Sequence, residues 1–213
     1  MYSNKTNLNE KKLGICMTTL IIYAHPETEG HCPEILKNVE AWHKEHQIEY
    51  TLLDLYKMEF DPVLKADELY TAGNQNITEE NKKIQEKLKE TEKIVIIHPV
   101  WWGSYPAILK GFFDRILTSG FAFNLKPLGF MGLAKPIAHL TGKKAAVIQT
   151  TGSPKIIAAT ILGNRFRKTM KNETLGFCGI SSKFFLVDKA TQLNEAKKEE
   201  IERIATKAMK WLY

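Results

Sequence analysis

The chain has 213 residues, enough for one domain with a sizeable core, and its 44% hydrophobic and 25% charged residues are typical of a globular protein. The net charge is +6, but the basic residues are dispersed among acidic ones, which argues against a nucleic-acid-binding stripe. The apolar runs are too short to span a bilayer. The three cysteines, Cys16, Cys32 and Cys178, have no metal-ligand spacing and indicate a reducing, cytoplasmic compartment.

The first segments predict an extension, a strand and a helix. Residues 1–17 are polar and predict a flexible N-terminal extension, so that a single domain covers 18–213. The apolar run Thr18–Ala24 predicts the first strand. A helix follows it, because apolar residues recur at helical spacing: Ile35, Leu36, Val39 and Trp42.

The loop between this strand and this helix, His25–Cys32, has the setting of an anion site. The N-terminus of a helix presents free N–H groups and the positive end of a dipole. His25, Thr28 and His31 would add hydrogen-bond donors to a phosphate. Two acidic residues in the loop oppose an anion, however, and an ordinary connection from strand to helix explains the loop equally well.

The next segments continue the alternation of strands and helices. Ile48–Leu55 predicts the second strand. The polar connection 57–78 is long, which favours a lid or an interface loop over a tight turn. Thr78 is a suitable N-cap for a helix that runs to about Glu90.

The stretch Ile94–Leu117, IVIIHPVWWGSYPAILKGFFDRIL, organises the rest of the chain. Its apolar start, Ile94–Ile97, predicts a buried strand, and Ala107–Leu117 predicts a helix with Pro106 at its first turn. Between them lies a loop with three large aromatic residues: Trp101, Trp102 and Tyr105. Open α/β sheets bind ligands at this edge, and such a loop suits a flat ring system. The alternative is a hydrophobic loop that plugs the sheet or meets a partner subunit.

The last third of the chain predicts two more strands and two more helices. Gly120–Thr141 has no sustained period and indicates an irregular excursion over the sheet edge. Lys143–Gln149 predicts a strand, and the small residues of Thr150–Pro154 follow it. The remaining predictions are a helix over Ile157–Leu175, a strand over Gly179–Val187 and an amphipathic helix over Ala190–Leu212.

The pattern of five strands alternating with five helices predicts an α/β fold, a doubly wound, five-stranded parallel sheet with helices on both faces. In the flavodoxin-like strand order, 2-1-3-4-5, the loops after the first, third and fourth strands are neighbours at one edge of the sheet. These loops offer a phosphate grip, an aromatic wall and a row of hydroxyls. Together they predict a flavin site and no metal site.

From Thr18 onward the chain resembles the flavodoxin-like NAD(P)H:quinone oxidoreductases. The most specific motif is HPVWWGSYPAILKGFFDRIL followed by GFAF at Gly120–Phe123. The loop AHPETEGH, the FDP of Phe60–Pro62 and the TTG of Thr150–Gly152 support it. The resemblance implies bound FMN, with FAD as the alternative, NAD(P)H as co-substrate, a homodimer and a quinone-like acceptor.

The resemblance also implies which residues contact the flavin. Its phosphates would lie near His25, Gly30, His31 and Cys32. Its ring would lie against Pro99, Val100, Trp101, Trp102 and Gly103. Its pyrimidine edge would bond Thr150, Thr151 and Gly152. The family usually has a hydroxyl where this chain has Gly30, and often an asparagine where it has Cys32. Phe121 and Phe123 resemble acceptor-pocket or dimer residues.

The expected reaction is a two-electron, ping-pong transfer of hydride from NAD(P)H to a quinone, with azo or nitro compounds as further acceptors. Trp102 and Tyr105 are the predicted catalytic residues, as the wall that stacks on the rings. The sequence also leaves open a flavin-binding regulatory subunit of a potassium efflux system and a single-electron carrier of the flavodoxin type. Such carriers are usually acidic, which the +6 charge opposes mildly.

Overall fold

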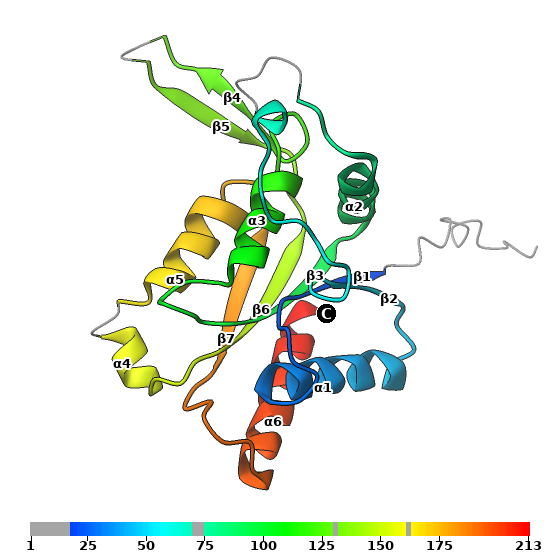
Figure 1. Cartoon of the computed structure of the whole chain (residues 1–213), viewed down its shortest axis with the longest axis vertical. Coiled ribbons are helices and arrows are strands. Elements are labelled where there is room, and N and C mark those ends of the chain that lie inside the picture. Colours follow the sequence, from blue (N-terminus) through cyan, green and yellow to red (C-terminus); the bar gives the residue numbers. More distant parts are fainter. Residues whose placement is uncertain (1–17, 70–74, 130–131, 161–162) are drawn as a thin grey trace, which may run out of the picture.

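The computed structural model describes residues 18–69, 75–129, 132–160 and 163–213. The predicted extension 1–17 lies outside the described residues. Five parallel strands form the central sheet (Figure 1) in the order β2-β1-β3-β6-β7. The strands are β1 (Thr19–Tyr23), β2 (Tyr50–Asp54), β3 (Lys93–Pro99), β6 (Lys144–Thr150) and β7 (Ser181–Val187).

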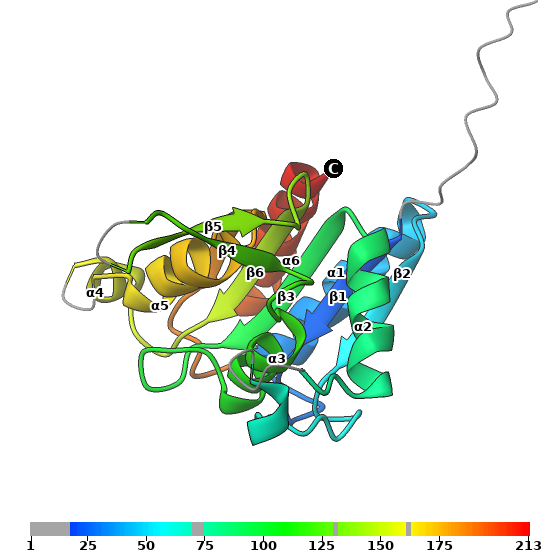
Figure 2. The same cartoon turned by 90° about the horizontal axis from the view of Figure 1, so that it is seen from above.

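Helices cover both faces of this sheet (Figure 2), as the sequence predicts. Helices α1 (His31–Glu45) and α6 (Glu195–Leu212) pack on one face. Helices α2 (Glu79–Glu90) and α3 (Ala107–Ile116) pack on the other. The predicted cap of α2 is confirmed, because the Thr78 side chain accepts a hydrogen bond from the backbone N–H of Asn81.

The predicted strand order, 2-1-3-4-5, is not matched because it omits two strands. The segment 120–141 contains the antiparallel pair β4 (Phe123–Pro127) and β5 (Ala134–Ala138), which extends from the body of the protein (Figure 1). These strands were missed because both contain proline, and their residues are almost all exposed. The hydrophobic alternation that marks a half-buried strand is therefore weak here.

The predicted helix Ile157–Leu175 is wrong as a single element. The structure has α4 (Lys155–Ala159), then α5 (Arg165–Lys168) and a π-helical segment, η3 (Thr169–Leu175). Gly163 and Asn164 have positive φ angles of 60° and 52°. A right-handed helix cannot continue through that conformation.

The FDP motif packs against α3, which belongs to the stretch Ile94–Leu117. This contact explains why the two motifs occur together in the sequence. Phe60 packs on Phe112 with ring centroids 5.6 Å apart. A Cβ atom at Gly111 would lie 2.1 Å from the carbonyl oxygen of Pro62, so only glycine allows this close approach. The guanidinium of Arg115 donates to the backbone oxygen of Asp61.

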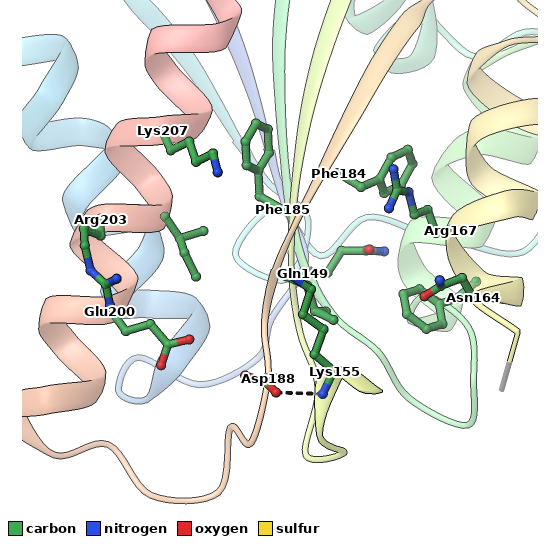
Figure 3. Close-up of a pocket in the computed structure, with 13 residues that line it drawn as sticks. Gln149, Lys155, Asn164, Arg167, Phe184, Phe185, Asp188, Glu200, Arg203 and Lys207 are labelled. Atoms are coloured by element: carbon green, nitrogen blue, oxygen red, sulfur yellow. Dashed lines mark hydrogen bonds between the residues drawn. The ribbon is translucent and has the colours of Figure 1, made fainter. Parts of the chain in front are cut away.

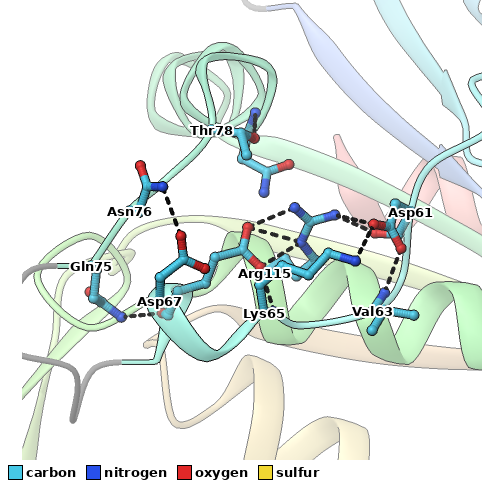
Figure 4. Close-up of polar contacts among 10 residues, drawn as sticks. Asp61, Val63, Lys65, Asp67, Gln75, Asn76, Thr78 and Arg115 are labelled. Carbon is cyan, nitrogen blue, oxygen red and sulfur yellow. Dashed lines mark hydrogen bonds and ion pairs between the residues drawn. The ribbon is translucent and has the colours of Figure 1, made fainter.

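A buried ion pair completes this attachment (Figure 4). Arg115 and Glu68 are both buried, and the guanidinium donates to the two carboxylate oxygens at 2.6–3.1 Å. Glu68 ends the short 3₁₀ helix η1 (Ala66–Glu68), and its carboxylate also accepts the N–H of Lys65. The long connection after β2 is therefore fixed to the helix that follows the aromatic loop.

Candidate functional site

A cavity of about 390 Å³ lies where the carboxyl ends of β1, β3 and β6 meet the N-terminus of α1. The ends of parallel strands are the usual ligand-binding edge of an open α/β sheet. Most of the predicted flavin residues line it: His25, Gly30, His31, Cys32, Pro99, Val100, Trp101, Thr150, Thr151 and Gly152.

The N-terminus of α1 is open to this cavity. Gly30 precedes the helix with a φ angle of 115°, a conformation that side chains rarely adopt, and no side chain caps the helix. The first N–H groups of the helix have no partners within the helix itself. The Nε2 atom of His31 is also buried without a hydrogen-bond partner. The N–H groups form a set of donors suited to an anion, and Nε2 of a protonated His31 would extend it.

Burial lowers the pKa of His31, and a backbone hydrogen bond with Gln192 acts in the opposite direction. A neutral imidazole has one N–H, which the contact with Gln192 uses, so Nε2 donates to an anion only when the ring is protonated. Burial raises the pKa of the Cys32 thiol to about 12, and Cys32 contacts the Thr150 hydroxyl at 3.5 Å. Cys32 is therefore an uncharged packing residue of the cavity wall.

The aromatic loop is a tight turn. Trp101 and Ser104 exchange two backbone hydrogen bonds of 2.9 Å, and Trp102 and Gly103 between them have φ angles of 51° and 70°. Positive φ is uncommon for a bulky residue and is found where strain serves a site. The turn leaves the Trp102 side chain fully exposed. The ring centroid of Trp101 lies 6.0 Å from that of His25.

Backbone hydrogen bonds hold three loops around the cavity. The N–H of Val100 donates to the oxygen of Thr150 at 2.7 Å, which joins the aromatic turn to the TTG loop. The N–H of Ala190 donates to the oxygen of Thr151 at 2.9 Å, which joins the TTG loop to the loop before α6. The cavity is thus framed by backbone contacts.

His98 connects the strands beneath these loops. Its Nδ1 atom lies 2.8 Å from the carbonyl oxygen of Pro99, and its Nε2 atom lies 3.0 Å from the amide nitrogen of Gln149. A carbonyl only accepts, so Nδ1 carries the proton and Nε2 accepts from Gln149. Complete burial lowers the pKa of His98 to about 4. The pair links the ends of β3 and β6 just before the two loops begin.

Four predicted site residues do not line this cavity. Thr28 is exposed on the first loop, and Trp102 and Gly103 form the tip of the turn. Tyr105 is buried and packs edge-on against His98 and Phe113. It lines a different cavity of about 400 Å³ together with Phe123 and Phe177, whose rings lie 4.8 Å apart.

Three further residues of the cavity lie in the loop before α6, namely Ala190, Thr191 and Leu193. The sequence predicts a helix that begins at Ala190, but α6 begins at Glu195. The side chain of Asn194 accepts the N–H of Lys197 and caps the helix. Asn194 is a preferred N-cap residue, and its position before the periodic region of α6 is the sequence signal that places the helix start after this loop.

Over the part of the chain that the structure describes, no cluster of side chains is suited to a metal ion. No described helix is long and apolar enough to cross a membrane. The fold and cavity define a flavodoxin-like α/β protein with a ligand site at the carboxyl edge of its sheet.

Comparison with known proteins identifies the family. A family model described as flavodoxin-like fold matches residues 17–212. The chain is 33% identical over 186 residues to ribosyldihydronicotinamide dehydrogenase [quinone] of Pongo abelii, with 75% of this chain and 76% of that protein covered. It is 35% identical over 150 residues to FMN-dependent NADH:quinone oxidoreductase of Lachnoclostridium phytofermentans, covering 67% of this chain and 69% of that protein. The chain belongs to the flavodoxin-like NAD(P)H:quinone oxidoreductase family.

Two further comparisons bear on coverage and fold. An uncharacterized NAD(P)H oxidoreductase of Haemophilus influenzae is 35% identical over 120 residues, which cover 56% of this chain and 59% of that protein. The alignment therefore spans less than two thirds of that relative. The crystal structure of Smu.1420 from Streptococcus mutans is 28% identical, with a TM-score of 0.77 and coverage of 91% of this chain and all of that one.

Proposed function

We propose that the protein is an FMN-dependent NAD(P)H:quinone oxidoreductase, with azo and nitro compounds as further acceptors. The observation that carries this proposal is the cavity that brings together the uncapped start of α1, the aromatic turn and the TTG loop. The names of the relatives support FMN as the cofactor and a quinone as the acceptor. In this proposal 18–213 is a single flavin-binding domain.

The residues present fit the phosphate of FMN. A Cβ atom is absent at Gly30, where the backbone conformation is one that glycine alone adopts readily. The N–H groups at the start of α1 would donate to the phosphate oxygens. The orphaned Nε2 of His31 would join them with the ring protonated, a form that a nearby anion favours. Glu27 also lines the cavity and opposes the anion. FAD remains the alternative cofactor.

FMN, when bound, supplies the hydride-transfer chemistry between NAD(P)H and the quinone. The hydroxyls of Thr150 and Thr151 and the N–H of Gly152 would orient the polar edge of the ring and offset its negative charge. Pro99, Val100 and Trp101 would cover one side of the ring and exclude water.

Trp102 lies with Gly103 at the exposed tip of the turn, and from there it would stack on the ring of the flavin or of the quinone. Tyr105 would act from the second cavity, and Thr28 would add a donor at the phosphate. Water, His25 or Tyr105 would deliver the proton that the acceptor takes up with the hydride.

An anaerobic absorbance titration tests this function. The purified protein, loaded with FMN, should bleach when NADH or NADPH is added and recover its colour when a simple quinone follows. A protein that binds no flavin contradicts the proposal. A flavoprotein that neither nucleotide bleaches also contradicts it, and that result favours the carrier or the regulatory subunit.

We also infer that the protein works as a homodimer in the cytoplasm. The β4–β5 hairpin supports the dimer, because paired residues of an antiparallel ladder project to the same face. One face of this hairpin is wholly apolar: Phe123, Leu125, Pro127, Ala134, Pro136 and Ala138. The free thiols Cys32 and Cys178 support a reducing compartment.

A further inference from the structure

Strand β7 forms one edge of the central sheet, and a cavity of about 370 Å³ straddles this edge. Figure 3 shows β7 with Arg203 and Lys207 of α6 on one side and Arg167 and Asn164 on the other. The cavity therefore touches both faces of a single strand. A ligand that filled it would lie along the strand's open side.

Backbone groups of β7 point into this space. The N–H of Ser181 and the oxygen of Val187 both bond toward β6. In a parallel strand the N–H and C=O of one residue point the same way, and this direction alternates along the chain. The groups of Phe184 and Leu186 therefore point away from β6, and both residues line the cavity. Among the described residues nothing outside the ladder bonds to them.

The walls of the cavity carry unbalanced positive charge. Its four cations are Lys155, Arg167, Arg203 and Lys207, and within the described ranges none of them forms an ion pair. Of the two carboxylates, Glu200 is already paired with Lys197 at 2.6 Å. Asp188 accepts the backbone N–H of Lys155. The walls are thus complementary to an anion.

A lysine on an edge strand often serves to block pairing with another chain. Lys183 does not have that position here. Its ammonium group lies 5.7 Å from the ring centroids of both Phe185 and Trp211. The side chain therefore lies over the α6 face of the sheet and leaves the backbone edge of Phe184 and Leu186 uncovered.

We propose that the edge of β7 binds an extended acidic peptide segment of another protein, which adds to the sheet as a sixth parallel or antiparallel strand. Strand addition supplies backbone hydrogen bonds, and alternate side chains of the ligand point to opposite faces. Here each face offers arginine or lysine. Arg167 lies over the ring of Phe184 at 5.6 Å on one face, and Arg203 and Lys207 are exposed on the other.

Charge argues against two other occupants. A second copy paired through its own β7 would bring two basic walls together. Residues 1–17 of this chain contain three lysines and one glutamate, so they would also meet like charge. The partner that the charges favour is therefore acidic and comes from another chain.

The test uses the full-length protein at low salt and a blocked seven-residue peptide of alternating glutamate and valine. Amide hydrogen exchange is followed by NMR. We expect exchange at Phe184 and Leu186 to slow at least tenfold, and exchange at Phe185, which faces β6, to change little. A lysine–valine peptide should have no effect. Unchanged exchange with the acidic peptide, or equal slowing by the basic one, would overturn the proposal.

Two charge-reversal variants distinguish binding at the β7 cavity from attraction by the net charge of the protein. Arg203→Glu with Lys207→Glu changes two exposed positions of α6 and should weaken peptide binding at least tenfold in calorimetry. Lys83→Glu with Lys87→Glu makes the same change at the same spacing on α2, far from the groove, and should leave binding nearly unchanged. An equal loss in both variants would mean that net charge alone attracts the peptide, against the proposal.

Other occupants give distinct results in the absence of peptide. Slow exchange at Phe184 and Leu186 that disappears when residues 1–17 are deleted would assign the edge to this chain's own N-terminus. Slow exchange that grows with protein concentration would assign it to a second copy. Either result overturns the proposal, whereas fast exchange in both experiments agrees with it.

Discussion

His98 is a fully buried imidazole that remains neutral because of where it lies. Burial lowers its pKa from 6.5 to about 4, and Gln149 donates to the neutral form. Between these pH values the unfolded chain binds a proton that the folded chain does not. The free energy of unfolding therefore falls as the pH is lowered from 6.5 to 4, by up to about 3 kcal/mol from this residue.

His98→Phe removes this titration and keeps an aromatic ring beside Tyr105. We expect a lower free energy of unfolding at pH 7, since Gln149 loses its acceptor, and a flatter dependence on pH between 4 and 6.5. Urea unfolding followed at several pH values measures both. Burial also lowers the pKa of His43, so part of the slope will remain. An unchanged slope in the variant would show that folding does not lower the pKa of His98.

Trp102 is an exposed residue in a conformation that asparagine tolerates better than tryptophan. Trp102→Asn should therefore keep the turn and the stability of the fold but remove the aromatic face. We expect FMN or the quinone to bind about 2- to 10-fold more weakly, the usual range for one aromatic pair. Trp102→Phe should restore most of the loss. Fluorescence titration with FMN and the KM for the quinone measure the effect, and wild-type values in Trp102→Asn would remove Trp102 from the site.

At the scale of elements, the ion pair between Arg115 and Glu68 fixes the connection after β2 to α3. Arg115→Met leaves the Glu68 carboxylate buried without its ion-pair partner and should lower the free energy of unfolding by about 3–5 kcal/mol. Glu68→Met should cost less, because the Arg115 guanidinium also lies 3.7 Å from the Asp61 carboxylate. The double variant should recover much of this loss, because both charges are gone. Urea unfolding of the wild type, the two single variants and the double variant gives the coupling free energy between Arg115 and Glu68. Single variants that lose less than about 1 kcal/mol would mean that the pair behaves like an exposed one.

The elements that the sequence predicts well are those whose hydrophobic period reflects burial. Strands β1, β3 and β6 are buried along nearly their whole length, and their apolar runs predict them. The sequence does not predict the hairpin β4–β5, because most of its apolar residues are exposed and only Phe123, at its base, packs on the core of this chain. The contact between Pro62 and Gly111 could not be predicted either, because a contact between distant segments produces no hydrophobic periodicity in the local sequence.

For the candidate site too, the sequence predicts some features and leaves others undetermined. The loops after β1, β3 and β6 were identified because parallel strands bring their carboxyl ends to one edge. The roles of Trp102 and Tyr105 could not be separated from sequence, because a turn with two positive φ angles exposes one ring while the other enters the core. Thr191 and Leu193 line the cavity only because α6 begins after them, and periodicity alone defines helix boundaries poorly.

At the scale of the whole molecule, the β4–β5 hairpin allows a matched test of the homodimer. A two-stranded hairpin is marginally stable alone, so its apolar face needs a partner. Leu125 lies on that face and is 42% exposed, and Ile137 lies on the opposite face and is 46% exposed. Leu125→Glu should shift the protein toward monomers in light scattering after gel filtration, whereas Ile137→Glu should not. A wild-type protein that is monomeric at micromolar concentration contradicts the homodimer. Equal dissociation by both changes would instead mean that the interface does not select the apolar face.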